Sequence, residues 1–272
     1  MAETNGTMLI TGAAGGVGTF LRTGLAELGW TVRGFDLRTP PEPGPVEWIV
    51  GDIGDPAALD AAMRDVDVVI HLAGIPSEDR FERILTTNIE GTYQVFDAAV
   101  RAGVPRVLAA SSNHAVGYYE RADFREAPVG VDVRPRPDTY YGVSKVFMEA
   151  IGSFYADRHG LRVACVRIGS CFQEPRSRRM LDTWLSPADS VRLFHALATS
   201  PDLRNEIVYG ISANKTAWWD LENARRLGYE PQDDSDVFAE KIEADAEGEP
   251  DPEDPAFKYL GGDFTTFVPP EE

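Results

Sequence analysis

Two adjacent tyrosines precede a lysine in the stretch DTYYGVSK, which covers residues 138–145. Residues four positions apart share one face of a helix, so Tyr141 would lie beside Lys145 whereas Tyr140 would not. A phenol held beside an ammonium group can ionise below its ordinary pKa of about 10. The pair is therefore a candidate for acid–base chemistry, although a helix start with one packed and one exposed tyrosine would give the same pattern.

A second candidate site is the glycine-rich turn TGAAGGVG at residues 11–18. Gly12, Gly15 and Gly18 lie between an apolar strand and a helix, where glycines allow a tight turn and a close approach of the backbone to a pyrophosphate. Asp36 ends the next strand, where a carboxylate binds ribose hydroxyls and repels the 2′-phosphate of NADP. Arg38 could accept that phosphate, but the carboxylate favours NAD.

Alternating strands and helices must position these residues. Between residues 7 and 170 the sequence predicts strands at 7–11, 31–36, 47–52, 67–74, 106–112 and 162–170, with helices at 16–28, 56–65, 80–101 and 140–159. This rhythm predicts an α/β Rossmann fold with a doubly wound parallel sheet. We expect residues 5–170 to form the NAD-binding domain and residues 171–272 a smaller substrate-binding lobe. The acidic, proline-rich run at 243–255 is expected to be a solvated tail segment.

Composition restricts the partners of the protein. The 272 residues carry a formal net charge of −18, and only four lysines stand among the 26 basic residues. Such a surface repels nucleic acid and acidic membranes, and no apolar run approaches the roughly 20 residues of a membrane helix. The two cysteines, Cys165 and Cys171, give no zinc-ligand spacing, so no metal is expected. A cytoplasmic protein that forms a homo-oligomer is predicted.

The glycine spacing together with the Tyr-x-x-x-Lys pair resembles the extended short-chain dehydrogenase/reductase family over about residues 7–230. This resemblance implies that Tyr141 is the general acid/base and that Lys145 binds the nicotinamide ribose and lowers the tyrosine pKa. It also implies a hydrogen-bonding residue after the fifth strand, for which Ser112 is preferred although Asn113 could serve. Residues implied to contact NAD are Gly12, Gly15, Gly16, Val17, Gly18, Asp36, Leu37, Asp52, Ile53, Leu72, Ala73, Gly74, Asn88, Tyr141, Lys145 and Ile168.

Five further stretches, SSNHAVGYY, YGVSK, RIGSC, RRMLDTW and SANKTAWWD, resemble the uronate dehydrogenases of that family. These enzymes oxidise C1 of cyclic glucuronate or galacturonate with NAD and produce an aldarolactone. The resemblance implies that the substrate contacts Ser77, Ser112, Asn113, His114, Tyr141, Ser170 and Arg179. A planar guanidinium suits capture of the uronate carboxylate. Pro76 departs from the serine that often follows the HLxGI stretch, so the contact would fall to Ser77.

Three alternative functions share parts of this sequence pattern. An anion pocket of arginine and serine could bind phosphate, which would make the protein an NAD-dependent glucose 6-phosphate dehydrogenase. A regulator that senses NAD without catalysis usually lacks the Tyr-x-x-x-Lys pair, which is intact here. An epimerase with tightly held NAD usually has a longer lobe than the roughly 100 residues that follow Ser170.

Overall fold

One parallel sheet forms the centre of the computed structural model, which describes residues 5–124, 126–246, 248 and 251–270. Its strand order is β3-β2-β1-β4-β5-β6-β9, and all six pairings are parallel. The strands of this sheet are β1 (Thr7–Thr11), β2 (Thr31–Asp36), β3 (Glu47–Val50), β4 (Val68–His71), β5 (Arg106–Ser112), β6 (Arg162–Ile168) and β9 (Asn205–Gly210). The order reverses between β1 and β4, and ligands of such sheets bind where the carboxyl ends of the strands diverge.

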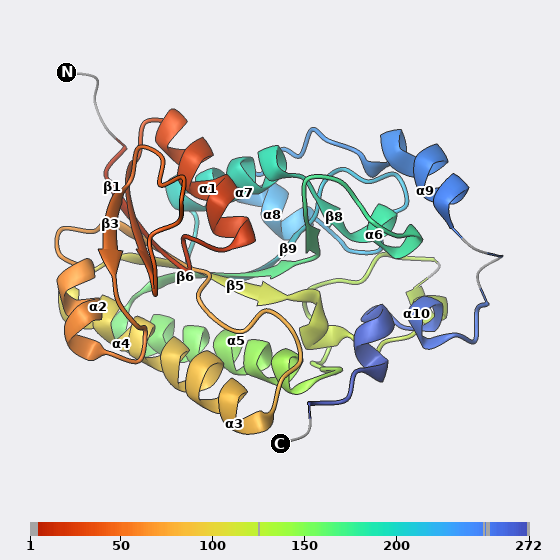
Figure 1. Ribbon diagram of the computed structural model, residues 1–272, viewed down its shortest axis with the longest axis horizontal. Coiled ribbons are helices and arrows are strands. Elements are labelled where there is room, and N and C mark those ends of the chain that lie inside the picture. Colours follow the sequence, from red (N-terminus) through yellow and green to blue (C-terminus); the bar gives the residue numbers. More distant parts are fainter. Residues whose placement is uncertain (1–4, 125, 247, 249–250, 271–272) are drawn as a thin grey trace.

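Helices cover both faces of the sheet (Figure 1). They are α1 (Gly16–Glu27), α2 (Pro56–Ala62), α3 (Phe81–Ile84), α4 (Gly91–Ala102), α5 (Tyr140–His159), α6 (Arg178–Thr183), α7 (Pro187–Thr199), α8 (Glu222–Arg226), α9 (Ala239–Asp245) and α10 (Pro255–Lys258). The view places α1, α7 and α8 on one face and α2, α4 and α5 on the other. The predicted doubly wound architecture is confirmed.

The side chains of each inner strand point alternately into two separate hydrophobic cores. In β1, Met8 and Ile10 join the core under α1 and α7, whereas Leu9 joins the core under α2, α4 and α5. Side chains of a strand alternate between faces, so a strand covered on both faces must be apolar at nearly every position. The continuous apolar runs in the sequence have this cause.

The long helix predicted at 80–101 is divided into three segments. It consists of α3, a π-helical turn η1 (Leu85–Glu90) and α4. A π turn carries one more residue per turn than an α-helix and often occurs at functional sites. In this chain the turn contains the buried Asn88, one of the residues that the family resemblance implies to contact NAD.

Residues after 170 contribute to the sheet as well as to an added lobe. β9 pairs with β6, and α7 packs against α1, so these two elements belong to the layers of the main sheet. Beyond the sheet lie the short pair β7 (Ser170–Cys171) and β8 (Trp184–Leu185), α6, α9, α10, and the 3-10 helices η4 (Ser235–Phe238) and η5 (Gly262–Thr266). The expected division at residue 170 therefore does not coincide with a break in packing.

The acidic run is only partly a solvated segment. Its first residues end α9, residues 247 and 249–250 lie outside the described part of the chain, and Pro255 begins α10. The chain then folds back, because the amides of Leu260 and Gly261 donate to the carbonyls of Tyr119 and Gly117. We call residues 259–266 the C-terminal strap.

None of the helices in the described parts of the chain has both the length and the apolar character needed to cross a membrane. Within those parts, no three His, Cys, Asp or Glu side chains are placed to hold a metal ion.

Candidate active site

The turn after β1 leaves no room for side chains at two of its glycines. Gly12 has a φ of 72°, and a Cβ there would come within 2.6 Å of the Ala73 amide nitrogen. A Cβ at Gly18 would come within 2.5 Å of the Gly12 carbonyl oxygen. Helix α1 begins at Gly16 with Gly15 as its cap, so its first amides face the turn. This arrangement fits a pyrophosphate, which helix N-termini and close backbone approach both stabilise.

Asp36 lies where β2 ends and faces this glycine turn. Its Oδ2 accepts a hydrogen bond from the Ala14 amide at 2.9 Å, and its Oδ1 accepts one from the Leu37 amide at 2.8 Å. The carboxylate is therefore oriented by two backbone donors and keeps lone pairs for ribose hydroxyls. Its negative charge at this position is consistent with a preference for NAD over NADP.

The residues predicted to surround adenine follow β3. Asp52 is exposed and accepts a hydrogen bond from the Gly54 amide at 2.8 Å, which stabilises the turn into α2. Ile53 is buried, and its Cδ1 lies so close to Gly91 that a Cβ there would come within 2.5 Å of it. Leu72, Ala73 and Gly74 follow β4 and border the glycine turn. Contacts of these residues with the cofactor remain predictions.

Tyr141 and Lys145 lie on the same face of α5, as their spacing predicts. The Lys145 ammonium lies 5.2 Å from the centre of the Tyr141 ring and donates to the Ala110 carbonyl at 2.7 Å. Tyr140 points elsewhere, because its exposed ring packs edge-to-face on Phe81. Of the two tyrosines, Tyr141 is therefore the one that lies beside Lys145.

Burial shifts the pKa of Tyr141 upward, and whether Lys145 lowers it in the enzyme with bound cofactor stays a prediction. Burial raises this pKa to about 12, a nearby Asp138 acts in the same direction, and a hydrogen bond with Ser112 opposes the rise. Burial also lowers the pKa of Lys145 to about 8. Desolvation disfavours the charged form of each group and outweighs their mutual attraction, since the ammonium donates to a carbonyl and not to the phenol.

Asn88 links the loop after β4 to α5. Its Oδ1 accepts from the Ile75 amide at 2.8 Å, and its Nδ2 donates to the Ile75 carbonyl at 3.0 Å and to the Ser144 hydroxyl at 3.2 Å. Glu78, which sequence reasoning missed, accepts from the amide of Tyr141 at 3.0 Å. The loop that carries Ser77 is therefore held at both ends against the catalytic helix.

A buried ion pair fixes α5 against the sheet behind the catalytic residues. Glu149, one turn after Lys145, accepts from the Arg167 Nε and Nη2 at 2.8 and 2.9 Å and from the Ser111 hydroxyl at 2.7 Å. Both charges are nearly inaccessible to solvent, so the bidentate geometry and the extra hydrogen bond are needed to offset their desolvation. This pair ties α5 to β5 and β6, the strands that carry Ser111 and Arg167.

The segment after β5 turns sharply into the 3-10 helix η2 (Asn113–Val116). Ser112 caps this helix, because its hydroxyl accepts from the His114 amide at 3.2 Å. The His114 Nδ1 donates to the buried carboxylate of Asp138 at 2.7 Å, and its ring stacks on Phe264 with centroids 3.8 Å apart. Burial lowers the pKa of His114 although Asp138 opposes this effect, so the ring is neutral near pH 7.

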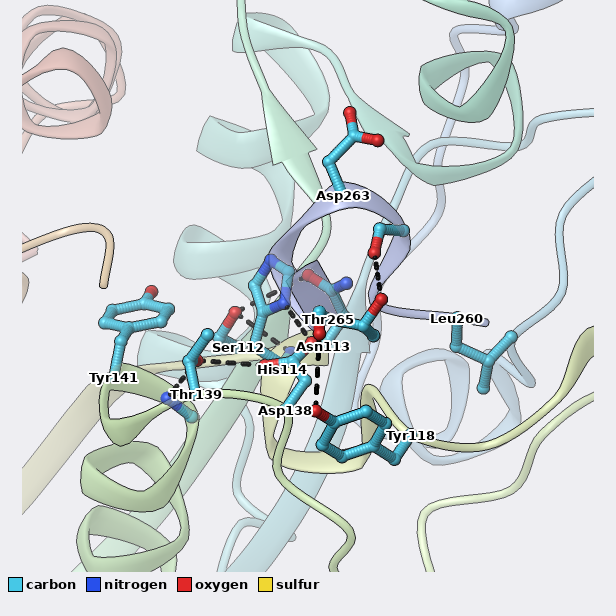
Figure 2. Close-up of polar contacts among 12 residues, drawn as sticks. Ser112, Asn113, His114, Tyr118, Asp138, Thr139, Tyr141, Leu260, Asp263 and Thr265 are labelled. Carbon is cyan, nitrogen blue, oxygen red and sulfur yellow. Dashed lines mark hydrogen bonds and ion pairs between the residues drawn. The ribbon is translucent and has the colours of Figure 1, made fainter. Parts of the chain in front are cut away.

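Figure 2 shows Ser112, Asn113, His114 and Tyr141 close together between β5 and the start of α5. The His114 and Tyr141 rings meet edge-to-face with centroids 6.0 Å apart. The structure thus brings these four predicted residues together beside Lys145.

Arg179 approaches these residues from α6. With the Asn113 amide oriented so that its oxygen faces the arginine, the Arg179 Nη2 donates to this oxygen at 2.8 Å and the Asn113 nitrogen donates to the Ile168 carbonyl at 3.0 Å; this assignment satisfies both groups, whereas the opposite orientation satisfies neither. The Arg179 Nε and Nη2 also donate to the Leu260 carbonyl at 3.1 and 2.5 Å. Within the described residues Nη1 has no hydrogen-bond partner. Burial lowers the Arg179 pKa to about 10, so the guanidinium remains positive at neutral pH.

The other predicted substrate residues lie around this centre. Ser170 is buried and shares a hydrogen bond with the Thr183 hydroxyl at 2.8 Å. Ser77 is half-buried in the loop that Asn88 and Glu78 hold. Of the two neighbouring arginines in the sequence, Arg176 packs over Phe172 and Arg178 pairs with Glu243, so Arg179 alone of the three contacts Asn113.

Sequence reasoning missed the C-terminal strap. Phe264 covers His114, and Leu260 contributes its carbonyl to Arg179. The Tyr118 hydroxyl donates to the Thr265 carbonyl at 3.3 Å (Figure 2). Main-chain acceptors carry no residue signature, and the strap follows an acidic segment typical of a tail. The phenylalanines at 264 and 267 are the sequence signal that this segment packs against the rest of the protein.

The model of the NAD dependent epimerase/dehydratase family matches residues 8–220. The chain belongs to this family. The match includes the glycine turn, Asp36, the Tyr141–Lys145 pair and Arg179. The match confirms the family resemblance, and it also confirms the prediction that the protein is an NAD-dependent enzyme.

Several proteins of the NAD dependent epimerase/dehydratase family are similar to this chain over nearly its full length. A uronate dehydrogenase from Pseudomonas syringae pv. tomato is 42% identical over 96% of this chain and 94% of its own length. An NAD-dependent glucose-6-phosphate dehydrogenase from Haloferax volcanii is 39% identical over 89% of this chain and 97% of its own. A crystal structure of a mutant uronate dehydrogenase from Agrobacterium tumefaciens, complexed with NAD, superposes with a TM-score of 0.91 at 39% identity, covering 98% of this chain and 99% of that one.

Proposed function

We propose that the protein oxidises C1 of a cyclic hexuronate, glucuronate or galacturonate, to the aldarolactone with NAD. The observation that carries this proposal is the position of Arg179. Its Nη1 is available at the end of a surface that runs through Asn113 and His114 to Tyr141. The similarity to uronate dehydrogenases along nearly the whole chain supports the same reaction.

The cofactor would be held by the carboxyl ends of β1, β2 and β4. The amides at the start of α1 would face the pyrophosphate, and Asp36 would accept hydrogen bonds from the adenosine ribose. Lys145 would donate to the nicotinamide ribose and supply a positive field below about pH 8, where it keeps its proton. NAD, when bound, supplies the hydride acceptor and a positively charged ring.

Proton transfer would fall to Tyr141. Its phenolic oxygen takes the proton of the anomeric hydroxyl as C1 loses hydride, and Ser112 hydrogen-bonds the reacting oxygen. With a pKa of about 12 the phenol does not ionise on its own near neutrality. Positive charge from Lys145 and from the cofactor must therefore favour the phenolate in the ternary complex.

The acid-binding end suits a carboxylate better than a phosphate. Leu260 and Asn113 already occupy the Nε and Nη2 of Arg179, which leaves Nη1 as its uncommitted donor. The nearest second guanidinium, Arg121, is bound to the carbonyls of Ala256 and Tyr259 and lies 3.9 Å above the Trp218 ring. The one available N–H edge of the Arg179 guanidinium matches the single negative charge of a uronate carboxylate. A uronate is therefore favoured over glucose 6-phosphate.

The proposal assigns different roles to the two parts of the chain. Residues 5–170 hold NAD, whereas residues 171–272 supply Arg179, Ser170 at the boundary and the C-terminal strap to the sugar acid. We also propose a cytoplasmic homo-oligomer. Exposed Tyr93 on α4 and exposed Val143 and Phe154 on the neighbouring α5 support self-association, since large apolar side chains on adjacent helices favour burial.

NADH formation measured on a small panel tests the proposal. Glucuronate, galacturonate, glucose 6-phosphate, UDP-glucose and galactose are offered with NAD, and reduction is followed by absorbance. We expect turnover with one or both uronates and little with galactose, which lacks the carboxylate. Turnover with glucose 6-phosphate and none with uronates would replace the proposal with the sugar-phosphate alternative.

A further inference from the structure

A buried carboxylate lies directly behind His114. The side chain of Asp138 has no area accessible to solvent, and its Oδ2 lies 2.7 Å from the His114 Nδ1 (Figure 2). Its other oxygen, Oδ1, accepts a hydrogen bond from the Thr139 hydroxyl at 2.9 Å. Two glycines pack against it, because a Cβ at either Gly117 or Gly261 would collide with Oδ2. The carboxylate is therefore enclosed, with one hydrogen-bond donor at each oxygen.

The contacts of Asp138 determine which ring nitrogen of His114 carries hydrogen. The Thr139 hydroxyl donates to the carboxylate, and the positive charge of Arg179 interacts with it, so an ionised acceptor fits these surroundings. Burial lowers the pKa of His114, which leaves the ring neutral near pH 7 with hydrogen on one nitrogen only. A carboxylate beside Nδ1 places that hydrogen on Nδ1. Nε2 is then a hydrogen-bond acceptor.

This acceptor has no partner in the described parts of the chain, where the His114 side chain bonds through Nδ1 and not through Nε2. The ring is held in place, since it stacks on Phe264 with centroids 3.8 Å apart and meets the Tyr141 ring edge-to-face. The His114 side chain keeps only 9% of its area accessible. A nearly buried acceptor without a partner costs free energy unless a ligand satisfies it.

We propose that Asp138 is a positioning residue that fixes the Nδ1–H tautomer of His114, so that Nε2 accepts a hydrogen bond from one ring hydroxyl of the sugar acid. This inference rests on the proposed function. His114 lies beside Tyr141, which would act at C1, and near Arg179, which would bind the carboxylate on C5. The hydroxyl concerned is therefore the one on C2, C3 or C4. Fluorine in its place accepts but cannot donate, so it would leave Nε2 unpaired.

Nuclear magnetic resonance of the ring nitrogens tests the tautomer without any substrate. Nitrogen shifts distinguish a protonated ring nitrogen from an unprotonated one, and His114→Gln identifies the signals of His114 among the four histidines. We expect a protonated Nδ1 and an unprotonated Nε2 in the wild-type protein near pH 7. A protonated Nε2 would mean that the Asp138 carboxyl group donates to the ring, and it would overturn the inference.

Asp138→Asn should invert this tautomer. The Thr139 hydroxyl oxygen accepts from the Gly142 amide, so its hydrogen stays directed at residue 138 and selects the amide oxygen of asparagine. The amide nitrogen then faces the His114 Nδ1 and donates to it, which leaves the ring hydrogen on Nε2. The nitrogen signals should show this exchange. An Nε2 that stayed unprotonated in the variant would mean that Asp138 does not set the tautomer.

Deoxyfluoro analogues of glucuronate measure the polarity of Nε2 during catalysis. Fluorine replaces the hydroxyl on C2, C3 or C4 in turn, and kcat/KM is compared with that for glucuronate. With the wild type, one analogue should lose roughly 10 to 100-fold. In Asp138→Asn this penalty should shrink about tenfold, because a protonated Nε2 can donate to fluorine. Both sugars carry the same carboxylate, so the charge lost near Arg179 cancels in the ratio. A merely structural role would leave the penalty unchanged, and that result would overturn the inference.

Asp263→Asn is the matched control. Asp263 is exposed and its charge also acts on Arg179, but Figure 2 shows its carboxylate pointing away from His114. This variant should keep the wild-type nitrogen signals and the wild-type penalty for each analogue, and a changed tautomer would count against Asp138. If Asp138→Asn folds poorly, the wild-type nitrogen signals still decide. Uronate turnover with a protonated Nε2 would refute this inference alone, whereas absence of uronate turnover would refute the proposed function as well.

Discussion

The two ends of the pocket are built in different ways. The cofactor end is made mostly of backbone, with glycines, helix amides and one carboxylate drawn from consecutive elements between Thr7 and Asp36. The acid end is made of groups from three distant segments, namely the side chains of Asn113 and Arg179 and the main-chain carbonyl of Leu260 in the strap. The first is a local property of the chain, whereas the second exists only after the whole chain has folded. Substrate specificity can therefore change without disturbing cofactor binding.

The largest expected effect lies where the two ends meet. Tyr141→Phe removes the proton acceptor and should lower kcat by roughly 10² to 10⁴, the usual size of general acid–base catalysis, with NAD affinity nearly unchanged. Tyr140→Phe is the matched control, because that ring packs on Phe81 at the surface and should matter little. Steady-state kinetics with a uronate and NAD titration by fluorescence measure both. Equal damage from the two substitutions would mean that the proton acceptor lies elsewhere.

The next effect should be confined to the acid end. A charge-assisted hydrogen bond is worth about 1.5–3 kcal/mol, so Arg179→Ala should lower kcat/KM for uronates by roughly 10 to 100-fold. Arg179→Lys should recover part of this loss, because it keeps the charge but not the planar fork that also binds Leu260 and Asn113. KM for NAD should stay the same. If galactose oxidation fell as much as uronate oxidation, Arg179 would be holding the pocket and not the carboxylate.

The third prediction concerns the cofactor end alone. Asp36→Ala removes the acceptor for the Ala14 amide and for ribose, and should raise KM for NAD about tenfold while relaxing discrimination against NADP. Asp36→Asn keeps an acceptor but loses the charge, so it should relax discrimination with a smaller loss of NAD affinity. Neither substitution should alter KM for the uronate. A wild-type preference for NADP would show that Arg38 governs the choice.

The smallest expected effect tests the strap. Phe264→Leu removes the ring stacked on His114, and aromatic pairs contribute about 0.5–1.5 kcal/mol beyond their buried area. KM for uronates should rise roughly 2 to 10-fold, without a change in KM for NAD. Phe267→Leu, which alters an exposed neighbouring ring, is the control. A larger effect on NAD than on the uronate would contradict the separation of the two ends.

The sequence was informative where a function depends on local spacing. The glycine turn, the strand and the helix on either side of it and the choice of Tyr141 over Tyr140 follow from local residue types and from periodicities of two and 3.6 residues. It was uninformative where a function depends on tertiary contacts. The strap binds Arg179 through a main-chain carbonyl, which any residue at position 260 would provide. The high pKa of Tyr141 depends on burial, which the four-residue spacing to Lys145 does not reveal.

The π-helical turn at Leu85–Glu90 makes one part of the chain intolerant of changes in length. Surface loops usually accept insertions and deletions, but a π turn arises from one extra residue in an α-helix. Deleting one residue there would restore regular α-helical winding and remove the widened turn that positions Asn88. Asn88 would then lose Ile75 and Ser144 together, although no residue in contact with the substrate had been replaced. Among homologous chains, this segment should therefore vary in residue type while keeping its length.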